Sequence, residues 1–373
     1  MIYLDYSATT PVDEKVIEKF VYVTKKYIGN PNSSHLLGRE AKEVIDDVTL
    51  YLAKELNVKT SEIIYTSGAS ESNNLAIKGY CNANKHIGKH IITSEFEHSS
   101  VIAPISYLQK NGFIVDFIKL DPNGKVDLNH FKSILKEDTI LVSLSSINGE
   151  LGTKTNLKEI KSILKDFPNA KIHVDMTQSL GKEKLDLSYA DMAAFSAQKG
   201  YGFKGIGLLY KKDSVNIEPI IHGGRSTTNL RSGTPALGLI ASLQPTFEVS
   251  NENLETKVEY VKSLNEKIRI NLKNYSKVHI NSPEDAVAHI LNISIKGADA
   301  PSIAKAFEKY EVYFSPQSAC AQGTSPSRSV MALYNDIDLA TSSFRISLSY
   351  LTTIEEIEEF LNIFKKVYQE VAL

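Results

Sequence analysis

Short apolar runs alternate with amphipathic stretches along the first two-thirds of the chain. Residues 39–56 place five apolar side chains on one helical face: Val44, Ile45, Val48, Leu52 and Leu56. Short apolar runs bounded by polar residues are predicted to be strands; they lie at 62–67, 90–94, 139–146, 171–175, 192–196 and 205–210. Because helical stretches separate most of the earlier runs, the pattern predicts βα units and a mostly parallel sheet.

The last third of the chain has its own pattern. A long helical stretch near 245–275 is expected to lead into a second, smaller α/β unit. Its predicted elements are a strand within 288–295, a helix over 299–310 and a strand within 342–348. The final helix is predicted to begin with a capping box of Thr353 and Glu356. Its apolar face is Ile357, Phe360, Leu361, Phe364 and Val367. We therefore expect a large α/β domain with a mostly parallel central sheet, plus a smaller α/β domain.

Composition excludes several classes of protein. The 42 Lys and Arg residues against 44 Asp and Glu residues give a net charge of -2, so neither a nucleic-acid nor a membrane partner is expected. The N-terminal residues lack the pattern of a secretory signal, and no apolar run is long enough to span a membrane. The two cysteines, Cys81 and Cys320, do not make a disulfide framework and suit a reducing, cytoplasmic location.

Polar residues follow several of the predicted strands. Residues 68–74, "GASESNN", come after one strand, and His98, Asp175 with Gln178, and Lys199 come after three others. In open parallel sheets, ligands bind beyond the carboxyl ends of the strands. Taken singly, each has an ordinary explanation: a turn, a structural histidine, a helix cap or a surface lysine.

Together these residues are complementary to one ligand. A buried amine can condense with an aldehyde as a Schiff base, and desolvation favours this by lowering the pKa of an amine. A carboxylate can keep a pyridine nitrogen protonated, and a helix N-terminus with hydroxyl groups can bind a phosphate. The ligand that meets these requirements is pyridoxal 5'-phosphate (PLP). The glycines after Lys199 are expected to let the backbone pack closely where the lysine meets the cofactor.

The chain resembles a cysteine desulfurase, in the class V aminotransferase group of fold-type I PLP enzymes, along nearly its whole length. The blocks that carry the resemblance include "YLDYSATTPV" (3–12), "TSGASESNNLAIKG" (66–79), "HVDMTQSLGK" (173–182), "FSAQKGYGFKGIGLLY" (195–210) and "SSFRISL" (342–348). The resemblance implies a homodimer whose large PLP-binding domain covers 14–257. Residues 1–13 and 258–373 would form the small domain, which carries the cysteine loop and the substrate-carboxylate arginine.

The resemblance also implies a role for each matching residue. Lys199 would form the internal aldimine, Asp175 would pair with the pyridine nitrogen, and Gln178 with the phenolic oxygen. His98 would stack on the ring and act as an acid and base. Other cofactor contacts are implied for Ala69, Ser70, Ser196, Gln198 and, from the neighbouring subunit, Thr234.

Substrate binding and sulfur transfer follow from the same resemblance. Arg345 and Asn30 would hold the carboxylate of L-cysteine, and Asn148 is a further candidate contact. A planar guanidinium suits a carboxylate, although Arg345 on its own also fits a surface ion pair. The thiolate of Cys320 would attack the sulfur of the substrate, release L-alanine and keep a persulfide for an acceptor such as an iron–sulfur scaffold or a tRNA-thiolation protein. From the residues alone, Cys320 also fits a harmless surface cysteine.

Two positions depart from the family pattern. Gln198 stands where the family has histidine, and Gly149 stands where it has the second of two asparagines. Each lost hydrogen bond is worth roughly 1 kcal/mol, so a weaker hold on PLP is expected rather than loss of the mechanism. Three alternatives stay open: a selenocysteine lyase, another PLP-dependent carbon–sulfur lyase, and a non-catalytic sulfur-pathway partner.

Overall fold

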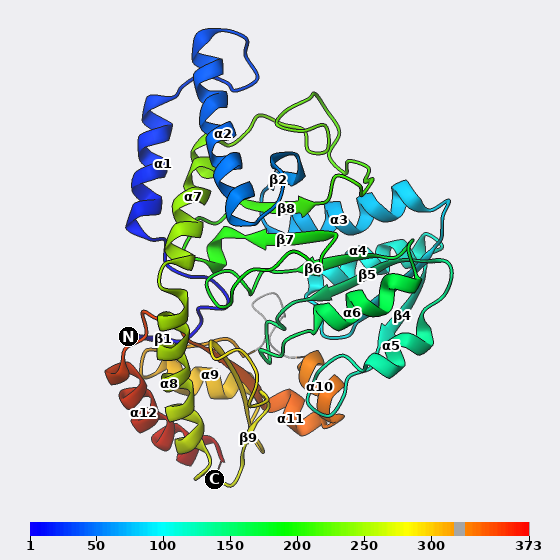
Figure 1. Cartoon of the computed structure of the whole chain (residues 1–373). Coiled ribbons are helices and arrows are strands. Elements are labelled where there is room, and N and C mark those ends of the chain that lie inside the picture. Colours follow the sequence, from blue (N-terminus) through cyan, green and yellow to red (C-terminus); the bar gives the residue numbers. More distant parts are fainter. Residues whose placement is uncertain (317–324, 373) are drawn as a thin grey trace.

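The computed structural model describes residues 1–316 and 325–372 and contains a large central sheet with helices on both faces (Figure 1). Among these residues seven strands form that sheet. Their order is β2 (Ile63–Thr66), β8 (Gly207–Lys211), β7 (Met192–Ser196), β6 (Lys171–Asp175), β5 (Thr139–Ser145), β3 (His90–Ser94) and β4 (Ile114–Ile118). Only β8 runs against its neighbours, so the prediction of a mostly parallel sheet is confirmed.

In the central sheet the six predicted strands are all present, and β4 is the one strand of that sheet that the pattern did not predict. It lies at the edge of the sheet, where Ile114 and Phe117 are exposed and Asp116 interrupts the apolar run. An edge strand with a polar residue and exposed apolar residues lacks the continuous apolar run that marks a buried parallel strand.

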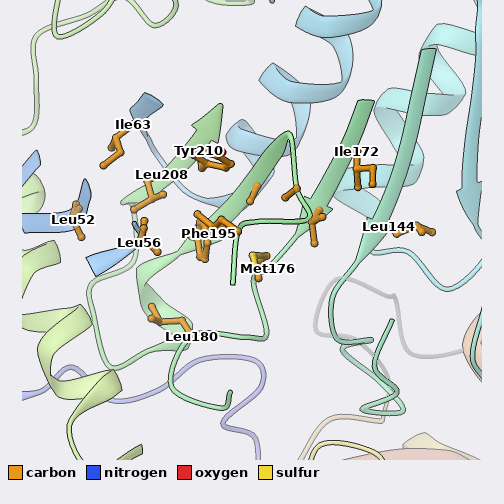
Figure 2. Close-up of a cluster of buried hydrophobic side chains, with 14 of the residues drawn as sticks. Leu52, Leu56, Ile63, Leu144, Ile172, Met176, Leu180, Phe195, Leu208 and Tyr210 are labelled. Carbon is orange, nitrogen blue, oxygen red and sulfur yellow. The ribbon is translucent and has the colours of Figure 1, made fainter. Parts of the chain in front are cut away.

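Helices cover both faces of the central sheet. α3 (Ala69–Asn84) and α4 (Ser99–Lys110) pack on one face. The other face is covered by α2 (Leu36–Glu55), α5 (Leu128–Ile134), α6 (Leu157–Ile163) and α7 (Leu237–Asn251), and α1 (Glu14–Lys26) packs on α7. Side chains alternate between the two cores: Leu208 and Tyr210 of β8 belong to one and Leu209 to the other. Figure 2 shows part of the first core, including Phe195, Leu208 and Tyr210.

The C-terminal part of the chain builds a separate core. Its elements are α8 (Leu254–Leu272), β9 (Val278–Ile280), β10 (Ile290–Ile295), α9 (Ala300–Glu308), β11 (Val312–Tyr313), α10 (Arg328–Tyr334), α11 (Ile337–Ser342), β12 (Ser343–Ser347) and α12 (Ile354–Ala372). β9, β10 and β12 form an antiparallel sheet, and β1 (Ile2–Tyr3) pairs with β11. Ile2 and Leu4 therefore pack in this second core with Phe307 and Phe360. The domain boundaries at 13/14 and 257/258 stay predictions.

The structure corrects one predicted helix and confirms the predicted start of another. The stretch near 245–275 is two helices rather than one, because Asn253 adopts a left-handed conformation (φ 53°) between α7 and α8. The predicted capping box of α12 is confirmed: the backbone N–H of Thr353 donates to Glu356 Oε2 (2.9 Å), and the N–H of Glu356 donates to Thr353 Oγ1 (3.1 Å). Across the described residues, the structure contains no helix with both the length and the apolar character needed to cross a membrane.

Candidate active site

A cavity of about 260 Å³ lies beyond the carboxyl ends of β2, β3, β6 and β7. The structure brings most of the predicted site residues to it: Ala69, Ser70, His98, Asp175, Gln178, Ser196, Gln198 and Lys199. They come together because the parallel strands end at the same edge of the sheet, and each residue follows one of those ends.

Lys199 ends a short 3₁₀ turn, Ala197–Lys199, that follows β7 directly. Its ammonium group donates to the backbone carbonyls of Ser7 (2.7 Å) and Ala8 (2.5 Å). The N-terminal segment therefore holds the amine at the wall of the cavity.

The glycines that follow Lys199 pack mainly against the protein itself. A Cβ on Gly200 would lie 2.6 Å from the side chains of Leu180 and Ser250, and one on Gly202 would lie 2.6 Å from Thr246 Oγ1. These glycines therefore let the lysine turn sit closely on α7, and of this run Gly205 is the glycine that lines the cavity. The expected close packing of the backbone beside Lys199 is present, and the contact of this run with a cofactor stays a prediction.

Asp175, at the end of β6, is almost fully buried and is held by neutral donors. Asn73 Nδ2 donates to its Oδ2 (2.8 Å), and the backbone N–H and hydroxyl of Thr177 donate to its Oδ1. The carboxylate is thus fixed in orientation and faces the cavity with its negative charge. Sequence reasoning missed Asn73; the available signal was a polar residue on a helix face that packs against the sheet.

His98 caps the N-terminus of α4. Its Nδ1 accepts a hydrogen bond from the backbone N–H of Ser100 (3.1 Å). The Ser100 hydroxyl accepts a hydrogen bond from Asn73, so its own hydrogen is free to donate to Nδ1 (2.8 Å). With Nδ1 as an acceptor, the neutral ring carries its hydrogen on Nε2. Burial lowers the pKa of His98, and the nearby Lys199 lowers it further against the opposing effect of Asp175. Proton exchange with a ligand is therefore expected at Nε2.

The start of α3 is suited to an anion. Gly68, with φ at +146°, turns the chain from β2 into the helix. The hydroxyl of Ser196 lies close to this glycine, 3.8 Å from the position that a Cβ would take. The first backbone N–H groups of a helix have no intrahelical partners and attract negative charge. Burial alone would raise the pKa of Glu71, but Arg231 Nε (2.8 Å) and the Ser67 N–H (2.7 Å) lower it, so this carboxylate is already paired.

Gln178 and Gly149 face each other in the cavity. The Gln178 Nε2 donates to the Ser7 carbonyl (3.0 Å), and a Cβ on Gly149 would lie 3.6 Å from that nitrogen. Asn148 does not line the cavity: its Nδ2 donates to the Phe96 carbonyl and its Oδ1 accepts from the next backbone N–H groups of the turn. The structure gives no support to a substrate contact by Asn148, because its amide holds the turn that carries Gly149.

Arg345 lies on β12 directly behind the cavity wall. Its guanidinium donates to the Gly149 carbonyl (2.7 Å) and to Asp5 Oδ1 (2.9 Å). Its buried Nε has no hydrogen-bond partner within the described part of the chain. Sequence reasoning missed Asp5. A substrate carboxylate bound by Arg345 would share the guanidinium with the Asp5 carboxylate.

The remaining predicted residues lie elsewhere. Asn30 is exposed, its Oδ1 accepts the Asn32 N–H (2.9 Å), and Asn32 lines a different cavity. Asn30 therefore does not line this cavity within one chain, and its role in substrate binding stays a prediction. Thr234 is exposed in the connection between β8 and α7 and does not line this cavity, and its reach into a neighbouring subunit stays a prediction. Cys320 lies outside the described residues.

Comparison with known proteins places the chain in a family. The class-V aminotransferase model matches residues 2–360. The chain is 38% identical, over 99% of its length and 97% of the relative's, to a NifS/IcsS protein homolog of Lactobacillus delbrueckii subsp. bulgaricus. It is 37% identical, over 98% of its length and 91% of the relative's, to the cysteine desulfurase IscS of Methylobacillus flagellatus.

Solved structures agree with this placement. A NifS-like protein superposes with a TM-score of 0.92 at 32% identity, covering 100% of this chain and 99% of its own. The structure of SspA in complex with cysteine superposes with a TM-score of 0.82 at 30% identity, covering 95% of this chain and 100% of its own. The chain belongs to the class-V aminotransferase family and, within it, to the cysteine desulfurases.

Proposed function

We propose that this chain is a PLP-dependent cysteine desulfurase that converts L-cysteine to L-alanine and keeps the sulfur as a persulfide on Cys320. The observation that carries the proposal is the single cavity in which Lys199, Asp175, Gln178, His98 and the start of α3 meet. The names of the relatives, and the cysteine bound to SspA, support the choice of L-cysteine as substrate.

The donor set of the cavity fits PLP. The start of α3, with the hydroxyls of Ser70 and Ser196, suits the phosphate, and the fixed carboxylate of Asp175 suits a protonated ring nitrogen. The amine of Lys199 suits the aldehyde carbon. When bound, PLP supplies an electron sink for bond cleavage in the amino-acid substrate.

The chain's own residues supply the remaining chemistry. His98 holds a proton on Nε2 at the cavity, and Arg345 offers a guanidinium, shared with Asp5, for the substrate carboxylate. In the sulfur-transfer step, the Cys320 thiolate forms an S–S bond while the C–S bond of the substrate breaks. The electron pair of the C–S bond stays with carbon, which takes up a proton and leaves as L-alanine.

The persulfide requires an acceptor. We propose a homodimer that passes sulfur to an acceptor protein, such as an iron–sulfur scaffold or a tRNA-thiolation protein. The two cysteines of the chain suit a reducing compartment, so we place the reaction in the cytoplasm.

The test uses purified, PLP-loaded protein with L-cysteine and a reductant, and quantifies alanine and sulfide. We expect equal amounts of the two, lost in Cys320→Ala and retained in the matched control Cys81→Ala, whose thiol is buried in α3. Alanine formation that persists in Cys320→Ala would instead identify a lyase that releases sulfide directly. No alanine from the wild-type holoenzyme would overturn the proposal, and much faster turnover of selenocysteine would indicate a selenocysteine lyase.

A further inference from the structure

A buried lysine stands behind the cofactor cavity. Lys182 follows Gln178 in the connection after β6, is 5% exposed, and does not line the cavity itself. Its Nζ donates a hydrogen bond of 3.0 Å to Oε1 of Gln178. Burying an ammonium group is costly unless the group has a partner, so this contact needs an explanation.

The contact determines which end of the Gln178 amide faces which neighbour. An ammonium group has donors and no acceptor, so the amide oxygen must point to Lys182. The NH₂ end then points the other way, where one hydrogen goes to the Ser7 carbonyl (3.0 Å). The same carbonyl accepts from Lys199, so the orientation of Gln178 is linked to the position of the reactive amine.

We propose that Lys182 is a positioning residue, which fixes the Gln178 amide so that its NH₂ end donates to an acceptor oxygen of the cofactor. The inference rests on the proposed function in one respect: that the ligand is PLP, whose ring carries a phenolic oxygen. Without Lys182, the amide can turn over and present its oxygen to that oxygen, which is repulsive.

The surrounding charges agree with this role. Burial lowers the pKa of Lys182 to about 7, Lys199 and Arg345 act in the same direction, and Glu183 opposes them. His289, buried and neutral because its pKa is also lowered, does not add to the charge on this side of the site. As pH rises through about 7, Lys182 loses the proton that makes it an obligate donor, and its control over the amide weakens.

The primary test replaces Lys182 with methionine, which keeps the length of the side chain and removes the donor. The matched control is Lys211→Met, because Lys211 is also buried but donates to the carbonyls of Lys212 and Val215, away from the cavity. Dissociation constants are measured for PLP and for its analogue without the phenolic oxygen, and the visible absorbance of the PLP-loaded protein is titrated against pH. These measurements need no L-cysteine.

We expect Lys182→Met to weaken PLP binding about tenfold, to shift the midpoint of the absorbance titration, and to leave binding of the analogue unchanged. Lys211→Met should leave all three unchanged. In a Gln178→Leu background, Lys182→Met should have no further effect, because both changes remove the same contact. Lys182→Arg keeps an obligate donor and should restore the wild-type affinity for PLP. Lys182 also borders a second cavity of about 480 Å³, which offers space for the larger guanidinium.

Two results would overturn the inference: equal weakening of PLP and of the analogue, which indicates general disruption, or no change in PLP binding and absorbance. If Lys182→Met does not fold, Lys182→Gln gives the same comparison, because a glutamine can present either end of its amide. Failure of the proposed function shows separately, as wild-type protein that binds PLP and makes no alanine from L-cysteine.

Discussion

Two residues of the cavity, Gly149 and Gln198, differ from the side chains that the family resemblance implies. Gln198 has a structural task through its backbone, because its carbonyl accepts both the N–H and the hydroxyl of Thr10 (3.0 Å each). Gly149 leaves space beside Gln178. The two departures therefore have different consequences, and the Gly149 departure is the one that a single substitution can reverse.

Gly149→Asn is expected to bind PLP about fivefold more tightly, because it adds an amide that can donate to the ligand. The backbone accommodates the change: an added Cβ meets Gln178 at 3.6 and 3.7 Å, which is ordinary contact. Equilibrium binding of PLP to the apoprotein measures the effect. Gly149→Ala is the control, and an asparagine variant that binds no better than the alanine variant would refute the expectation.

Glu97 makes the stability of the fold depend on pH. It is buried, Ser94 donates to its Oε1 (2.7 Å), and burial raises its pKa from 4.5 to about 7. Between pH 4.5 and about 7, Glu97 is protonated in the folded protein but ionised in the unfolded chain. Its contribution to stability is therefore fully present below pH 4.5 and is lost as pH rises through about 7.

Glu97→Gln should remove this loss. We expect the variant to exceed the wild type in free energy of unfolding by on the order of 3 kcal/mol at pH 8, with a smaller difference at pH 5.5. Urea unfolding of the apoprotein at the two pH values measures this difference. Parallel pH dependence in variant and wild type would show that Glu97 is ionised in the fold.

At the scale of elements, periodic patterns predicted the structure where one face is buried. α12 is an example: its apolar face packs in the second core and its capping box closes the first turn.

Removing the hydroxyl in Thr353→Ala should reduce the free energy of unfolding by about 1 kcal/mol, whereas Thr353→Ser should retain most of that stability. Thermal or urea unfolding compares them, and equal stability of the two variants would contradict the role of the cap.

The site was predictable to the extent that its residues follow strands. His98, Asp175 and Lys199 meet because parallel strands end at one edge, and that rule needs no coordinates. Asp5 was not predictable, because it reaches Arg345 through tertiary packing of segments far apart in sequence. Asn73 lies within the block 68–74, but its contact with Asp175 depends on how α3 packs on the sheet. The break between α7 and α8 at Asn253 was not predicted for a local reason. One left-handed residue interrupts the helix without changing the periodicity of the sequence pattern.

At the scale of the whole molecule, the N-terminal segment joins the two cores at the site. Ile2 and Leu4 pack in the second core, and a few residues later the Ser7 carbonyl holds both Lys199 and Gln178. Asp5 pairs with Arg345 between these points. Lys199 and Arg345 are therefore set relative to each other by the same short segment.

Movement of sulfur from L-cysteine to Cys320 is the step that defines the proposed activity. The most direct measurement incubates the PLP-loaded protein with L-cysteine without reductant, alkylates it, and determines the masses of its peptides. We expect one added sulfur atom on the peptide that contains Cys320, none on the peptide that contains Cys81, and one alanine for each sulfur bound. Alanine formed while the Cys320 peptide gains no sulfur would show that Cys320 does not receive the sulfur.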